Sequence, residues 1–177
     1  MNRSTFGDSY RYFPYKKDYT GNRTNNGGID LVDDPERLSE ITEASGFPEL
    51  RTIIQSINSV ESHWRTIGCE AGVGEDGSFY GYIEITPRDE EESRNEEYIS
   101  TLDECFSAWV VNKWPDHGNA IIDGFSWEYD WFSFKGKTNQ LKVVAFFRAQ
   151  RQEYAGQLLL ILEEYLAKSS NVAQQRS

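Results

Sequence analysis

The sequence predicts an α+β fold in which an antiparallel four-stranded sheet, built from two hairpins, packs against about four helices. Every second residue from 125 to 131 is aromatic, which is the period of a strand with one buried face. Residues 63–73 and 79–86 form a second pair of strand-like segments around a glycine-rich turn. Segments of helical periodicity surround both pairs, so the predicted order is helix, helix, strand, strand, helix, strand, strand, helix.

The chain has 177 residues, enough for one domain with a core rich in phenylalanine, tyrosine and tryptophan. We divide it into an N-terminal arm (residues 1–33), a single α+β domain (34–168) and a polar tail (169–177). The formal net charge is −11 and the pI about 4.7. Such a surface disfavours duplex nucleic acid and anionic lipid and favours a basic partner.

The N-terminal arm is tyrosine-rich, and residues 1–30 hold five cations against three anions. Three uses fit this composition. The arm stacks on single-stranded nucleic acid, packs on the acidic and aromatic surface of its own domain, or grips a second subunit.

Two helices are predicted before the first hairpin. Asp34 suits an N-cap, Pro35 a first helical position and Gly46 a C-terminal cap. A second helix is expected over residues 48–60, because its apolar residues recur at helical spacing. These inward residues are Leu50, Ile53, Ile54 and Ile57.

The first hairpin is predicted to turn at residues 74–77. Gly72, Gly74 and Gly77 match the spacing of a dinucleotide-binding loop, but a strand follows them where such a loop needs a helix. Alternation assigns residues to the two faces of the hairpin. In the first strand one face is predicted to hold Ile67, Cys69, Ala71 and Val73. In the return strand one face is predicted to hold Phe79, Gly81, Ile83 and Ile85, and the opposite face Tyr80, Tyr82 and Glu84.

The second hairpin is predicted to comprise a strand from residue 125, a turn at 136–140 and a return strand at 141–147. Phe132 and Phe134 fall out of phase with the preceding rings, which indicates a bulge near residues 130–132. The remaining helices are expected at 95–113, with Cys105 in the core, and at 152–168, where a wide apolar arc suits deep packing or dimer formation.

Composition argues against several kinds of chemistry. The two histidines and two distant cysteines do not support a Cys–His nucleophile pair, a zinc site or a disulfide framework, and no cofactor is expected. No stretch approaches the roughly 20 apolar residues that span a bilayer, and the N-terminal residues lack a signal peptide's apolar segment. We therefore expect a cytoplasmic protein without a membrane partner.

Carboxylates and aromatic rings coincide in the central hairpin. Glu128 and Asp130 are two residues apart and lie on one face of the predicted strand. There they form a cross-strand salt ladder, or a pair of acids that serves either acid/base chemistry or the binding of a partner's cations. Trp and Tyr typically anchor interfaces, while charges at the rim steer the encounter. The predicted partner-binding residues are Glu128, Asp130, Trp127, Tyr129, Trp131 and Tyr82, with Glu90, Glu91 and Glu92 at the rim.

These features favour a non-enzymatic acidic protein that neutralises a basic, nucleic-acid-binding protein partner, as an inhibitor, immunity or phage anti-defence protein does. Two alternatives stay open. One is a small-ligand-binding domain or small enzyme with an aromatic-lined pocket. The other is a homo-oligomeric scaffold, joined through the C-terminal helix or the N-terminal arm.

Overall fold

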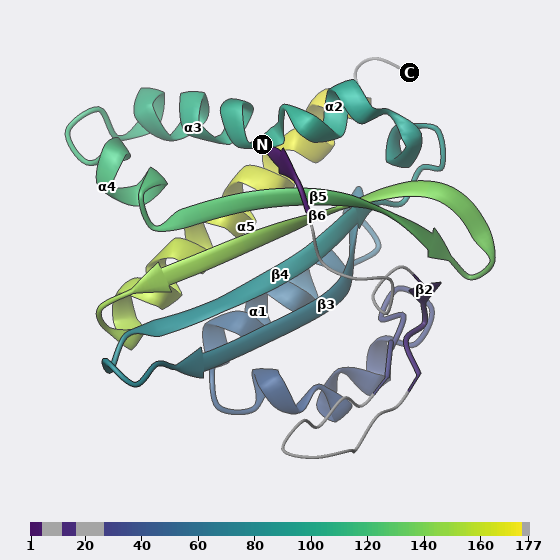
Figure 1. The fold of residues 1–177 in the computed structure, drawn as a ribbon, viewed down its shortest axis with the longest axis horizontal. Helices are drawn as coiled ribbons and strands as arrows, with labels where there is room; N and C mark the ends of the chain where they lie inside the picture. The colour runs from purple at the N-terminus through teal and green to yellow at the C-terminus, as the bar shows by residue number, and fades with distance from the viewer. Residues whose placement is uncertain (5–11, 17–26, 175–177) are drawn as a thin grey trace.

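The structure is a computed structural model that describes residues 1–4, 12–16 and 27–174, and these form a mixed α+β fold (Figure 1). These residues form six strands: β1 (Asn2–Arg3), β2 (Tyr12–Phe13), β3 (Trp64–Val73), β4 (Phe79–Pro87), β5 (Phe125–Phe134) and β6 (Lys137–Ala149). The α-helices of this part of the chain are α1 (Pro48–Ile57), α2 (Glu96–Ser100), α3 (Leu102–Lys113), α4 (Gly118–Ile122) and α5 (Gln152–Gln174). Short 3-10 helices are η2 (Pro35–Glu40), η3 (Thr42–Ala44) and η4 (Glu92–Arg94).

The four long strands form the two predicted antiparallel hairpins, but the sheet is larger than predicted. Its order is β1-β5-β6-β4-β3, and β2 also pairs with β5. Both β1 and β2 run parallel to β5, so the sheet is six-stranded and mixed, not four-stranded and antiparallel. The cause is the N-terminal arm, whose backbone pairs with an edge that the hairpin alone leaves open.

All α-helices of the described chain lie on one side of the sheet or along its β5 edge. Figure 1 shows α1 and α5 behind the strands and α2, α3 and α4 along β5. Phe106 of α3 is fully buried, with its ring centroid 5.1 Å from that of Phe125, 5.3 Å from Trp127 and 5.3 Å from Tyr165. The alternating aromatic residues of β5 therefore face the helices, because burying large rings removes much apolar surface from water.

We call the opposite side of the sheet the front face, because it faces the viewer in Figure 1. A small second core lies on it, made of Phe13, Ile67, Phe132 and Phe134. The ring of Phe13 in β2 stacks on the ring of Phe134, and their centroids are 5.2 Å apart. For the arm residues within the described ranges, the prediction of packing on the domain itself is confirmed, whereas Tyr10, Arg11, Lys17 and Tyr19 lie outside them.

The register of two strands differs from the prediction. A shift between Thr66 and Gly68 turns Ile67 to the front face, so its predicted place beside Cys69 and Ala71 is wrong. In β5 the irregularity lies between Phe132 and Phe134, slightly later than expected.

The second hairpin also turns earlier than predicted, at Lys135 and Gly136, which have φ of 50° and 85°. Positive φ at both positions is typical of a two-residue hairpin turn. The return strand β6 therefore begins at Lys137 instead of residue 141.

Several helices also differ from the prediction. The segment 34–46 forms η2 and η3 in place of an α-helix, and the segment 95–113 divides at Thr101 into α2 and α3. Cys105 is exposed and not in the core, because Leu102, Phe106 and Val110 form the buried side of α3. The sequence did not predict α4, and α5 continues beyond residue 168 into the predicted tail, of which residues 175–177 lie outside the described ranges.

No helix in the described part of the chain combines the length and apolar character needed to cross a membrane.

Candidate functional site

The β3–β4 hairpin closes at the turn that the sequence predicts. The Gly77 amide donates to the carbonyl of Gly74 at 2.9 Å, and the Gly74 amide donates to the carbonyl of Ser78 at 2.8 Å. Gly77 has a φ of 78°, a conformation that residues with a side chain rarely adopt. The glycines thus serve the turn, which leaves the side chains of Glu75 and Asp76 at its tip.

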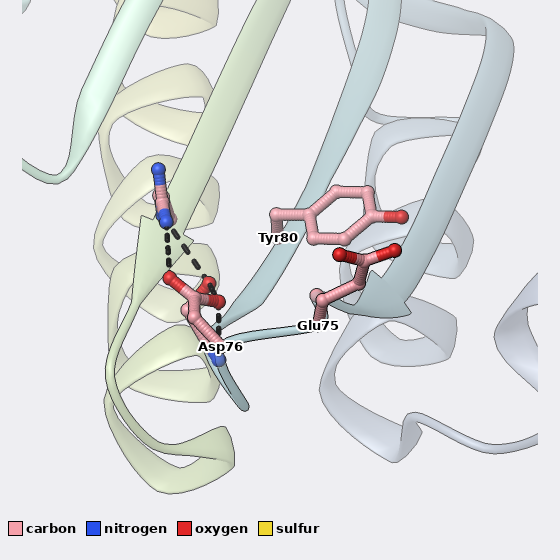
Figure 2. Close-up of a pocket in the computed structure, with 6 residues that line it drawn as sticks. Glu75, Asp76 and Tyr80 are labelled. Carbon is pink, nitrogen blue, oxygen red and sulfur yellow. Dashed lines mark hydrogen bonds and ion pairs between the residues drawn. The ribbon is translucent and has the colours of Figure 1, made fainter.

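An open hollow of about 350 Å³ lies beside this turn (Figure 2). Its lining consists of Gly74, Glu75, Asp76, Ser78, Tyr80 and Arg148. The Tyr80 side chain is on the front face and the residue is 43% exposed. Its ring lies over Gly72, where an added Cβ would be 3.4 Å from the ring. The missing side chain at Gly72 therefore leaves the aromatic surface accessible from the edge of the sheet.

The two acids of the hollow differ in their surroundings. Asp76 accepts hydrogen bonds from the Ser78 hydroxyl at 2.6 Å and amide at 3.0 Å, and from Arg148 at 2.6 Å. These bonds, those of Ser78 first, lower the pKa of Asp76 from its ordinary 3.8 to about 2. Glu75 has no hydrogen bond or ion pair within the described residues, and Figure 2 shows its carboxylate beside the Tyr80 ring.

This arrangement suits a cation. With Glu75 and Asp76 against Arg148, the hollow holds one net negative charge, and the charge without a partner is the one next to the ring. An ammonium or guanidinium group is attracted both by a carboxylate and by the face of an aromatic ring. The hollow can therefore bind a basic side chain.

A buried polar network occupies the middle of the front face. Lys142, 3% exposed, donates to Glu84 Oε1 at 2.7 Å, and the Tyr15 hydroxyl donates to Glu84 Oε2 at 2.5 Å. Lys142 Nζ also donates a hydrogen bond to the Tyr15 hydroxyl oxygen at 3.4 Å. Because its charges are compensated inside the chain, this network stabilises the arm on the sheet and offers no open binding group.

The predicted partner-binding residues divide between the two faces of β5 and its neighbours. Trp127, Tyr129 and Trp131 are partly buried on the helix side, where they pack against the main core. Glu128 and Asp130 lie on the front face, and so does Tyr82, whose ring is 5.9 Å from that of Phe146. The rings and carboxylates of β5 therefore do not form one surface.

The front-face carboxylates of β5 are largely enclosed. Asp130 is 4% exposed, accepts a hydrogen bond from the Trp131 amide at 2.8 Å and lies 3.8 Å from the Arg3 guanidinium. Glu128 is half-buried, and its Oε2 is buried without a hydrogen-bond partner in the described structure.

The predicted acidic rim lies at η4. Glu90 forms ion pairs with Lys137 and with Arg94, each at 2.6 Å, and Glu92 contacts His63. Glu91 is exposed. Glu90 is thus compensated by two cations of the chain, while Glu92 contacts an imidazole.

Within the described residues, no group of three or more His, Cys, Asp or Glu side chains is placed to hold a metal ion. His117 is exposed in the turn before α4.

Sequence reasoning assigned Tyr80 to the correct face but did not connect it with Glu75. The usable signal was Gly72, since a glycine opposite an aromatic residue in a hairpin exposes the ring. No protein-family model, no curated protein and no solved structure matches the chain.

Proposed function

We propose that this protein is a non-enzymatic binding protein that neutralises a basic protein partner. The observation that carries the proposal is the Glu75 carboxylate beside the exposed ring of Tyr80, without another partner in the described chain. A lysine or arginine of the partner placed there gains an ion pair and a cation–π contact. Tyrosines in such positions often carry much of the binding energy of an interface.

Charge supports the same role. A net charge of −11 accelerates encounter with a basic protein and makes association depend on ionic strength. Covering the basic surface of a nucleic-acid-binding protein would prevent it from reaching its substrate. The proposed role is therefore that of an inhibitor, an immunity protein or an anti-defence protein.

The test is affinity capture from host lysate followed by a binding assay with the purified partner. We expect a stoichiometric basic protein whose affinity falls with rising salt and drops by about tenfold or more in Glu75→Lys and in Tyr80→Ser. Asp116→Lys is the matched control, because Asp116 is an exposed acid in the turn between α3 and α4. Recovery of only a small molecule, or equal affinity of all variants, contradicts the proposal.

A further inference from the structure

The two edges of the sheet are treated differently by the chain. At the β5 edge, β1 and β2 pair with the outer strand. At the other edge, β3 is the last strand in the sheet order. An outer strand presents unpaired N–H and C=O groups and accepts an extended peptide as an additional strand.

The hydrogen bonding of the hairpin identifies which residues of β3 point outward. The bond from the Gly74 amide to Ser78 makes these two a hydrogen-bonded pair, and such pairs alternate along an antiparallel ladder. Gly72 and Glu70, opposite Tyr80 and Tyr82, therefore bond inward to β4. The backbone groups of Cys69, Ala71 and Val73 point away from the sheet.

These outward groups of Cys69, Ala71 and Val73 form no backbone hydrogen bond with another segment of the described chain, while η3 packs against β3 and partly covers Cys69 and Ala71. Towards the other end of β3, the register shift at Ile67 interrupts the regular edge. Val73 is 58% exposed, so the accessible end is the one beside the hollow.

The charges next to this edge favour a basic segment over a second copy of the chain. Glu70 is exposed on the front face, and Glu75 follows at the turn. A second copy would bring its own Glu70 towards this one and would add another net charge of −11. A basic strand pairs with these acids instead.

We infer that the basic partner binds by adding an extended segment as a strand along residues 69–73 of β3, an inference that rests on the proposed function. Residues two apart on that segment face the same side as Glu70 and Gly72. The basic side chain beside Gly72 reaches the Tyr80 ring and Glu75, because Gly72 has no side chain to block it. The basic side chain beside Glu70 forms the second ion pair.

The test uses the capped peptide Thr-Arg-Val-Arg-Val-Arg-Thr, in which arginines occupy one face of a strand. Amide exchange of the free protein should be at least about tenfold faster at Ala71 and Val73 than at Glu70 and Gly72. Saturating peptide should slow exchange at Ala71 and Val73 by tenfold or more. Two control peptides should leave the exchange rates of Ala71 and Val73 unchanged. One has glutamates in place of the arginines, and the other is N-methylated on alternate residues.

Variants separate this inference from the function on which it rests. Ala71→Pro removes one outward N–H and should reduce peptide and partner affinity at least tenfold, with folding checked by circular dichroism. If Glu75→Lys weakens partner binding while the N-methylated peptide protects as well as the parent, strand addition is refuted and the proposed function stands. If neither Glu75→Lys nor N-methylation changes binding, both are refuted.

Discussion

The Tyr15 hydroxyl donates a hydrogen bond to Glu84 Oε2 at 2.5 Å, although the two residues are 69 positions apart in the chain. The contact joins the N-terminal arm to β4 across the front face of the sheet. Glu84 is 8% exposed, so the arm residue satisfies a carboxylate that water scarcely reaches. The arm is therefore part of the folded domain at this point.

Loss of this hydroxyl should destabilise the protein. Tyr15→Phe leaves a buried carboxylate oxygen with one donor fewer, and we expect the free energy of unfolding to fall by about 1–3 kcal/mol. Urea denaturation followed by fluorescence measures the change. Tyr12→Phe is the matched control, because Tyr12 is 67% exposed on the same arm and should change stability by less than about 0.5 kcal/mol. Equal effects of the two variants would show that the Tyr15 bond contributes nothing specific.

Removal of Lys142 should cost more. Lys142→Met leaves the buried Glu84 charge without its cation, and we expect the unfolding free energy to fall by about 3–5 kcal/mol. Combining it with Glu84→Gln removes the uncompensated charge, so the double variant should be more stable than Lys142→Met alone. Denaturation of the single and double variants forms the cycle that checks this coupling. A double variant that is less stable than Lys142→Met would contradict it.

Much of the architecture follows from patterns in the sequence. The alternating rings before Trp131 predicted β5, and the apolar repeat from Leu50 to Ile57 predicted α1. Residue 67 shows where such reasoning ends, since no local pattern marks the shift that turns Ile67 to the front face. Its position depends on Phe13 and Phe134, which are distant in sequence.

The same limit explains why the strands β1 and β2 were not predicted and why Cys105 was placed in the core. Composition showed that the arm is aromatic and basic, but its pairing with β5 depends on contacts more than 100 residues apart. In α3 the apolar residues do not form one narrow stripe, so the periodicity predicted both Cys105 and Phe106 as inward residues. In the structure Phe106 is the inward residue, because its ring packs against those of Phe125 and Trp127.

The two cysteines should differ in reactivity. Burial raises the pKa of the Cys69 thiol, and the negative charges of Glu43, Glu84 and Glu70 raise it further, whereas Cys105 is exposed. A thiol reagent should therefore modify Cys105 at least about tenfold faster than Cys69 in the native protein. Mass spectrometry of peptides after timed labelling gives both rates. In Cys105→Ser, labelling should become slow until denaturant is added, and rapid labelling of that variant would show that the Cys69 thiol is not shielded.

Acid should weaken the hairpin only at low pH, because the pKa of Asp76 is lowered from 3.8 to about 2 in the folded protein. Because the pKa of Asp76 is lower in the folded state than in the unfolded state, its ionised carboxylate stabilises the folded state. This contribution is complete at pH values above the unfolded pKa of about 3.9. That contribution is lost as the pH falls from about 4 to about 2. Carbon-detected NMR titration of the Asp76 carboxyl group measures the folded pKa directly.

Substitutions around Asp76 should separate the causes of its low pKa. Ser78 provides the largest effect and Arg148 a smaller one, so Ser78→Ala should raise the pKa of Asp76 towards 3.8 by more than Arg148→Gln does. High salt should change the Ser78 contribution little, because screening acts on charges more than on a hydrogen bond from a buried hydroxyl. A larger rise in Arg148→Gln would show that the ion pair, and not the turn, holds Asp76 ionised. In that case the cation of a bound partner would compete with Arg148 for Asp76 as well as binding Glu75.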